Sequence, residues 1–102
     1  MTFKCISIED SKKLFDQQNL TIIDIRDYQS FLNGHLNNAI HVESINIDTF
    51  LKDKDKEEVI LIYCYHGNSS KPAANFFGEK GFKNVFSLDE GYAGWIKIKN
   101  SN

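Results

Sequence analysis

The sequence contains little cysteine, a single arginine and no long hydrophobic run. Its two cysteines, Cys5 and Cys64, are far apart and lack the spacing of metal ligands, so we expect neither a disulfide framework nor a metal site. The first residues contain no apolar core of a signal peptide, and no apolar run approaches the roughly 18 residues of a membrane helix. These absences predict a soluble, cytoplasmic protein with reduced thiols and no membrane contact.

The length and charge of the chain restrict its architecture and its partners. With 102 residues, of which 41% are hydrophobic, the chain is expected to form a single domain over residues 1–102 with a modest core. The net charge is −2, and the 12 cationic side chains are spread along the sequence. We therefore expect no nucleic-acid binding, and a monomer or weak dimer because no apolar stripe is left over.

Apolar runs and helix-boundary residues alternate along the chain. Short runs rich in β-branched residues predict strands, and capping residues such as Ser7 and Asp27 precede helical patterns. The expected strands are 5–7, 21–25, 39–42, 59–63 and 85–88, and the expected helices begin near Ser7 and span 27–32, 45–51 and 70–80. This alternation is typical of an α/β fold, here an open, mainly parallel five-stranded sheet with helices on both faces.

The most informative position is Cys64, which directly follows the apolar run 59–63. Polar residues after it lead into the next helix, and sites in parallel sheets lie at the carboxyl ends of strands. Loop amides and the helix N-terminus would favour a thiolate, whose pKa can fall from about 8.5 to roughly 3.5–7.5 in such settings. Gly67 would let the loop curl, because glycine tolerates positive φ. We interpret Cys64 as a nucleophile; the alternative is a buried core cysteine.

A cysteine followed by a short loop also occurs in protein tyrosine phosphatases and arsenate reductases. Their C-x5-R signature needs an arginine that grips the oxyanion through two hydrogen bonds. The corresponding position is Ser70, and Arg26 is the only arginine in the chain. A phosphatase would depend on Lys71, whose compact ammonium fits a planar fork of oxygens less well, so we favour another chemistry.

Four segments, in order along the chain, together resemble one known family. They are Asp24–Asp27 (a D-x-R segment), Gly34–Ala39 (similar to GHI-x-x-A), the loop Cys64–Lys71 and Gly91–Trp95 (G-x-x-x-W). On these motifs the chain resembles the rhodanese family, and its loop is similar to that of single-domain thiosulfate sulfurtransferases of the GlpE type. The resemblance implies a single rhodanese-like domain.

The resemblance also implies a sulfur relay through Cys64. The thiol would attack thiosulfate, release sulfite and carry a persulfide to an acceptor, which is cyanide in an assay and a thiol such as reduced thioredoxin in the cell. The six residues from Cys64 to Ser69 match the family's loop length for sulfur rather than phosphate, and no cofactor is implied. The alternative is a sulfur carrier charged by a protein partner. The substrate-binding residues would be Tyr65, His66, Gly67, Asn68, Ser69, Ser70 and Lys71.

Residues outside the loop receive structural interpretations. In the resembling family the arginine is mainly structural, so we expect an ion pair between Asp24 and Arg26 beneath the loop. Cys5 is interpreted as a small packed residue. Glu90 stands where many relatives have glycine, and its carboxylate would weaken thiosulfate binding by repulsion. The sequence ends soon after Trp95, so a longer C-terminal helix is expected to be missing or frayed.

Overall fold

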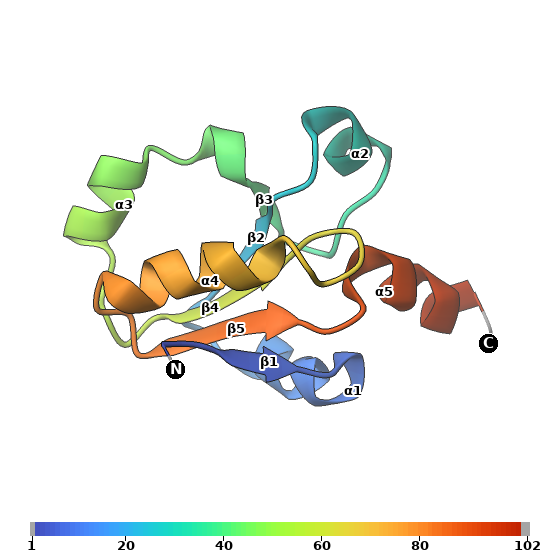
Figure 1. The fold of residues 1–102 in the computed structure, drawn as a ribbon, viewed down its shortest axis with the longest axis horizontal. Coiled ribbons are helices and arrows are strands. Elements are labelled where there is room, and N and C mark those ends of the chain that lie inside the picture. Colours follow the sequence, from blue (N-terminus) through green and yellow to red (C-terminus); the bar gives the residue numbers. More distant parts are fainter. Residues whose placement is uncertain (1, 101–102) are drawn as a thin grey trace.

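Strands and helices alternate along the chain in the computed structural model, which describes residues 2–100 (Figure 1). Its strands are β1 (Lys4–Ile6), β2 (Leu20–Asp24), β3 (Ile40–His41), β4 (Val59–Tyr63) and β5 (Asn84–Leu88). Its α-helices are α1 (Ile8–Ser11), α2 (Tyr28–Asn33), α3 (Ile47–Asp53), α4 (Ser70–Glu79) and α5 (Gly91–Asn100). Two 3-10 segments, η1 (Lys12–Asp16) and η2 (Val42–Ser44), complete the order of elements.

The five strands form one open, all-parallel sheet in the order β1-β5-β4-β2-β3. β4 lies at its centre, where Ile62 is paired with Ile23 of β2 on one side and with Ser87 of β5 on the other. All five residues of β4 are buried, which explains its uninterrupted apolar sequence, since a strand covered on both faces has no solvent side. The predicted α/β fold with an open five-stranded sheet is confirmed.

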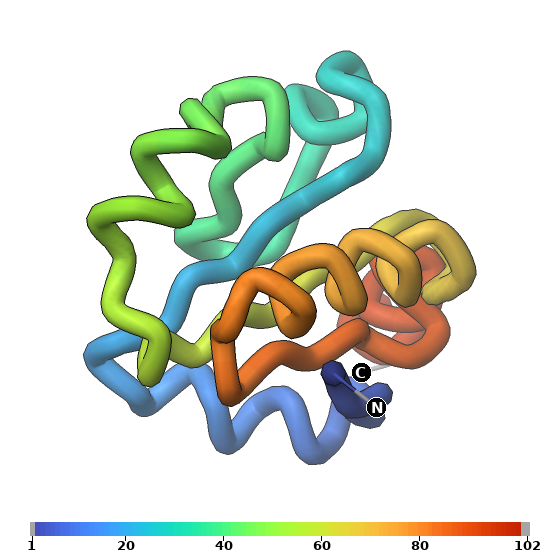
Figure 2. The backbone as a smooth tube through the Cα atoms, turned by 60° about the vertical axis from the view of Figure 1, so that its left-hand side comes forward, coloured from blue at the N-terminus to red at the C-terminus, as the bar shows by residue number. Residues whose placement is uncertain are grey.

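Helices cover both faces of the sheet, and the side chains of β4 alternate between two cores. Leu61 and Tyr63 belong to the core that includes residues of α1, η1 and α5. Ile60 and Ile62 belong to the core that includes residues of α3 and α4. Figure 2 shows α4 and the segment α1–η1 on opposite sides of the strands. This alternation directs Cys64, two residues after Ile62, toward α4.

The predicted boundaries agree best at the centre of the sheet. β4 has the predicted bounds, and α4 ends one residue before the predicted end. The capping residues Ser7 and Asp27 act as predicted, because their side-chain oxygens accept hydrogen bonds from the amides of Asp10 and Ser30. The other strands differ from their predicted bounds by one residue, at ends where pairing and burial rather than local sequence decide the boundary.

Two expectations were wrong. The last helix is neither missing nor frayed within the described residues, since α5 extends to Asn100. Trp95 packs edge-on against Phe15 with a ring-centroid distance of 5.6 Å, and this aromatic contact anchors the helix on the core. Cys5 is exposed rather than packed, because it lies on β1 at the edge of the sheet.

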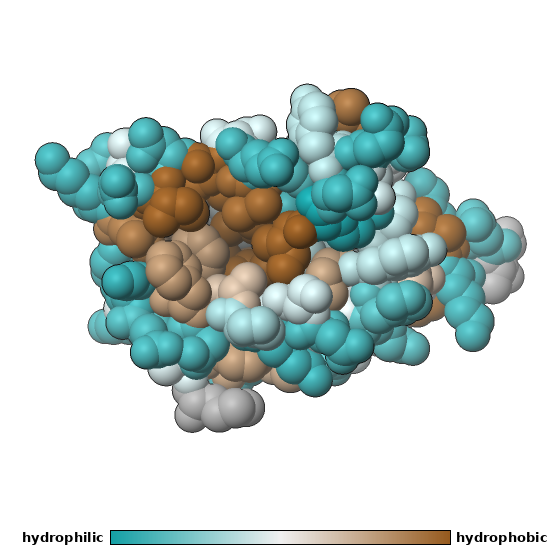
Figure 3. Space-filling view, turned by 45° about the horizontal axis from the view of Figure 1, so that its top comes forward, coloured by the Kyte–Doolittle hydropathy of each residue, from teal (hydrophilic) through white to brown (hydrophobic). Residues whose placement is uncertain are grey.

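The surface of the described residues carries an apolar area over two helices. Among residues 2–100, no helix combines the length and apolar character needed to cross a bilayer. Apolar side chains gather on the face formed by α3 and α4 (Figure 3). Ile47, Phe50 and Leu51 of α3 are partly buried there because they pack on the core below. The expected monomer or weak dimer stays a prediction.

Candidate active site

Cys64 lies where the connections of the sheet diverge. From β4 the chain passes through α4 to β5, whereas from β2 it passes through α2 to β3 on the opposite side. Such a divergence leaves a crevice at the carboxyl ends of the strands, which is the usual ligand position in open parallel sheets. A cavity of about 210 Å³ occupies this crevice. Its lining consists of Ile25, Arg26, Asp27 and Ser30 after β2 and of Cys64, Tyr65 and Ser69 after β4.

The sulfur of Cys64 is held by the loop that follows it. The amide of Gly67 donates a hydrogen bond to Sγ at 3.1 Å, and the hydroxyl oxygen of Ser70 lies 3.5 Å from Sγ. Gly67 has φ +91°, and a Cβ there would lie 3.0 Å from the backbone nitrogen of Glu90. Glycine therefore allows the loop to curl its amide toward the sulfur. Cys64 is only 5% exposed, so the loop encloses most of the side chain.

The surroundings of Cys64 favour its thiolate. Burial raises the pKa of the thiol, but the Ser70 hydroxyl and the amides of Ser70, Gly67 and His66 lower it, and the resulting pKa is below the ordinary value. Ser69, the N-cap of α4, makes no capping hydrogen bond with its side chain. The positive end of α4 therefore faces the sulfur without a competing side-chain cap.

The lowered pKa predicts that Cys64 reacts at a lower pH than an unfolded thiol. Because alkylation requires the thiolate, its rate with iodoacetamide should rise through a midpoint at lower pH in the folded protein than in the unfolded protein. The measurement is peptide mass spectrometry of the Cys64 peptide across a pH series, which separates Cys64 from the exposed Cys5. The same protein unfolded in urea provides the reference, and equal midpoints in the two states would contradict a stabilised thiolate.

Four of the loop residues predicted to bind substrate lie near the sulfur or its cavity. Tyr65, 58% exposed, and Ser69 line the cavity from the β4 side. Gly67 and Ser70 are buried and contact Sγ itself, as described above. The structure thus brings together the sulfur of Cys64, the Gly67 amide and Ser70 hydroxyl that contact it, and a small open space.

The other three loop residues are exposed, although the amide of His66 lies close enough to Sγ to lower the pKa of the thiol. His66 borders a neighbouring cavity together with Glu90 and Lys97. Asn68 and Lys71 are exposed, Lys71 in the first turn of α4. Their contact with substrate stays a prediction. Among residues 2–100, no group of three or more metal-ligating side chains gathers as a metal site requires.

Asp24 and Arg26 form an ion pair at the ends of the central strands. One guanidinium nitrogen of Arg26 donates to Asp24 Oδ2 at 2.7 Å and also lies 2.7 Å from the carbonyl oxygen of Gly34. The Tyr63 hydroxyl donates to the same carboxylate oxygen at 2.7 Å. The guanidinium lies over the ring of Tyr92, 4.0 Å from its centroid. These contacts tie β2, β4, the end of α2 and the start of α5 together, so the charge of Arg26 serves the fold.

The start of α5 supports the loop from the opposite side. The amides of Tyr92 and Ala93 donate to the carbonyl oxygens of Cys64 and Tyr65, both at 2.9 Å. Gly91 has φ +57°, and a Cβ there would collide with these two carbonyl oxygens. Glycine is therefore required at this position for α5 to approach the loop.

The similarity of the chain to known proteins agrees with this geometry. The sequence model of the rhodanese-like domain family matches residues 7–98, which is most of the chain. The chain belongs to the rhodanese-like domain family. Membership of this family suggests sulfur transfer or a related activity for the rhodanese-like domain.

Solved structures similar to this rhodanese-like domain share its fold. A protein from Bacillus halodurans is 29% identical, with a TM-score of 0.75 over 94% of this chain and 73% of that chain. A rhodanese-related protein from Thermoplasma volcanium is 23% identical, with a TM-score of 0.71 over 94% of this chain and 93% of that chain. A Rhodopseudomonas palustris protein of unknown function, described as a possible tyrosine phosphatase, is 18% identical. Its TM-score is 0.78 over 96% of this chain and 83% of that chain. The last two likenesses concern the fold alone.

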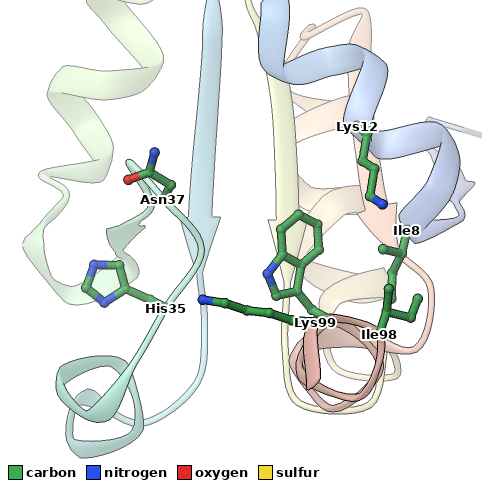
Figure 4. Close-up of a pocket in the computed structure, with 7 residues that line it drawn as sticks. Ile8, Lys12, His35, Asn37, Ile98 and Lys99 are labelled. Carbon is green, nitrogen blue, oxygen red and sulfur yellow. The ribbon is translucent and has the colours of Figure 1, made fainter. Parts of the chain in front are cut away.

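A larger cavity of this rhodanese-like domain lies away from the Cys64 loop. It has a volume of about 480 Å³ and is lined by residues of α1, of η1, of the segment after α2 and of α5 (Figure 4). Lys99 extends from α5 toward His35 across this space in Figure 4. The larger cavity shares no lining residue with the Cys64 cavity, and its lining contains no cysteine. Size alone therefore does not locate the chemistry.

Arg26 was expected beneath the Cys64 loop, but the contribution of Asp27 and Ser30 to the cavity was not predicted from the sequence. Asp27 and Ser30 were recognisable as the cap and first turn of a helix, but their position beside Cys64 depends on the order of the strands. The hydroxyl and amide of Ser30 donate to Asp27 and lower its pKa, so this carboxylate is charged at neutral pH. The cavity is thus bordered by an anionic group on one side and, on the other, by Cys64, whose sulfur accepts a hydrogen bond from an amide.

Proposed function

We propose that this rhodanese-like domain is a thiosulfate sulfurtransferase that carries sulfur as a persulfide on Cys64. The observation that supports the proposal is the setting of Sγ, which accepts a hydrogen bond from Gly67 at 3.1 Å and borders an open cavity. A thiolate in that setting is a ready nucleophile at neutral pH. The acceptor is cyanide in an assay and a thiol, such as that of reduced thioredoxin, in the cell.

The reaction consists of two displacements at sulfur. In the first, the Cys64 thiolate attacks the outer sulfur of thiosulfate; a new S–S bond forms while that of thiosulfate breaks, and sulfite leaves with the electron pair. In the second, cyanide or a thiolate attacks the outer sulfur of the persulfide, and the Cys64 thiolate leaves. Both nucleophiles are anions, so neither step transfers a proton and no general base is required. His66 therefore needs no catalytic role.

The loop provides the same electrostatic support throughout. The amides of His66, Gly67 and Ser70 that lower the pKa of the thiol would also stabilise the persulfide anion. Tyr65 and Ser69, which line the cavity, would contact the sulfonate of the donor. The persulfide places its outer sulfur one bond beyond the nearly buried Sγ, which makes it more accessible to an acceptor.

A cysteine-dependent phosphatase is the second candidate, because one protein of similar fold is described as a possible tyrosine phosphatase. Ser70 stands at the position of the arginine in the phosphatase signature, is fully buried and contacts Cys64 and Ser87. The sole arginine, Arg26, is paired with Asp24. A phosphate in the cavity would lack a guanidinium free to grip two of its oxygens, so we favour sulfur transfer.

Initial-rate kinetics with thiosulfate and cyanide test the proposal. Thiocyanate formation should give parallel double-reciprocal lines, the signature of a ping-pong mechanism, and an aryl phosphate should not be hydrolysed. Intersecting lines or phosphate release would contradict the proposal. A sulfur carrier, the other alternative, would turn over thiosulfate slowly but release sulfur to cyanide after charging by a persulfide-bearing protein.

Glu90 is predicted to limit both stability and donor affinity. Its backbone has φ +62°, a conformation that residues other than glycine adopt at a cost in free energy. Glu90 directly precedes Gly91, which supports the loop. We expect Glu90→Gly to raise the free energy of unfolding by about 1 kcal/mol in urea titrations. Removing the carboxylate should also lower the KM for thiosulfate about twofold at low salt.

Glu90→Gln is the matched control for this prediction. It removes the charge but keeps a side chain at the same φ, so it should lower the KM without increasing stability. If Glu90→Gly is no more stable than Glu90→Gln, backbone strain at this position is not the cause. If neither variant changes the KM, the carboxylate does not act on the donor.

A further inference from the structure

Ser87 is a buried hydroxyl beneath the Cys64 loop. It belongs to β5, is 1% exposed, and its Oγ lies 2.7 Å from Oγ of Ser70. The neighbouring residue on the same face of the strand, Val85, is apolar and belongs to the core with α4. A hydroxyl in such a core is unfavourable unless it is hydrogen bonded, so its partner is informative.

Ser87 Oγ, Ser70 Oγ and Cys64 Sγ form a continuous chain of polar contacts that begins in the core and ends at the sulfur. Ser87 Oγ contacts Ser70 Oγ at 2.7 Å, and Ser70 Oγ contacts Cys64 Sγ at 3.5 Å. The register of the sheet places Ser87 beside Ile62, two residues before Cys64. Ser70 is 0% exposed and begins α4. The chain therefore lies inside the protein, where hydrogen bonds are stronger than in water.

The protonation state of Cys64 sets the direction of this chain, since a neutral thiol donates to Ser70 Oγ whereas a thiolate can only accept. Each serine hydroxyl has one hydrogen, and a thiolate has none. When Cys64 is a thiolate, the Ser70 hydrogen points to Sγ. The short contact between Ser70 and Ser87 then requires that the Ser87 hydroxyl donates to Ser70 Oγ. Both O–H dipoles consequently point their positive ends toward the sulfur, and each strengthens the other.

We propose that Ser87 is a positioning residue that holds the hydroxyl hydrogen of Ser70 on Cys64 Sγ. The inference deepens the proposed function, since it rests on Cys64 acting as a nucleophile. Ser87 does not touch the cavity that would hold the donor and acts through Ser70. Two charged side chains border that cavity, Arg26 paired with Asp24 and Asp27 hydrogen bonded to Ser30. A change at Ser87 leaves both in place.

Alkylation of Cys64 by iodoacetamide across a pH series tests this role without requiring sulfur transfer. We expect Ser87→Ala to move the midpoint to higher pH and to lower the rate at pH values below the midpoint about threefold. Ser70→Ala should have a larger effect, because it removes the donor to sulfur itself. Ser11→Ala is the matched control, since Ser11 is also fully buried but its hydroxyl donates to the carbonyl oxygen of Ile8.

A second pair of variants separates the hydroxyl from packing. Ser87→Thr and Ser87→Val add nearly the same volume, but only threonine keeps a hydroxyl. The proposal predicts that threonine preserves the wild-type alkylation profile and that valine shifts it. An unshifted Ser87→Ala profile, equal shifts for threonine and valine, or the same shift in Ser11→Ala would overturn it. If the wild-type protein forms no persulfide while these shifts persist, the proposed function fails and the role of Ser87 stands.

Discussion

Replacing Cys64 with serine is expected to reduce thiocyanate formation from thiosulfate and cyanide by about three orders of magnitude or more. An alcohol is a far weaker nucleophile than a thiolate at neutral pH, and it cannot carry sulfur as a persulfide. Serine is close to cysteine in size, so the Gly67 amide and Ser70 keep a polar partner and the fold should be retained. The measurement is the initial rate at equal concentrations of folded protein.

Cys5→Ser is the control for the Cys64 variant. Cys5 lies on the edge strand β1 and is exposed, so its removal should leave the rate unchanged. If Cys64→Ser retains a rate close to that of the wild type, the nucleophile is another group. If both variants lose activity, both cysteines take part in the reaction, and a relay through Cys64 alone is wrong.

Replacing Asp24 with alanine is expected to lower the free energy of unfolding by about 3–5 kcal/mol. Asp24 is 0% exposed and accepts hydrogen bonds from Arg26 and Tyr63. Without it, the Arg26 side chain, which is 8% exposed, keeps its charge inside the protein without its ion-pair partner. Urea unfolding followed by circular dichroism measures the loss.

Tyr63→Phe provides the comparison for the Asp24 variant. It removes the hydroxyl that donates to Asp24 and accepts from the amide of Leu36, but leaves the ion pair intact. We expect it to cost about 1–3 kcal/mol, which is less than Asp24→Ala. If Asp24→Ala is no more destabilising than Tyr63→Phe, the carboxylate does not compensate a buried charge, and the pair contributes little to the fold.

The parts of the fold that sequence predicted correctly are those decided by local pattern. β4 was predicted with its observed bounds, because an apolar, β-branched run between polar segments has few alternatives. The loop after Cys64 was recognisable because it is contiguous in sequence and leads into a helix with Pro72 in its first turn. The candidate nucleophile and the donors Gly67 and Ser70 were therefore predictable from one stretch of chain.

The parts that sequence could not predict depend on the order of the strands. Asp27 and Ser30 meet Cys64 because β2 lies beside β4, and Ser87 reaches Ser70 because β5 lies on the other side. A serine within the apolar run 85–88 was a signal that a buried polar contact exists, but its partner could not be inferred. Cys5 was misinterpreted as packed because composition does not reveal which strand forms the edge of a sheet.

Mass spectrometry of the intact protein after brief incubation with thiosulfate tests the central claim most directly. The proposed relay predicts that the wild type gains the mass of one sulfur atom, loses it again on addition of cyanide, and that Cys64→Ser gains nothing. An unchanged mass for the wild type, or the same added mass on Cys64→Ser, would contradict a persulfide on Cys64.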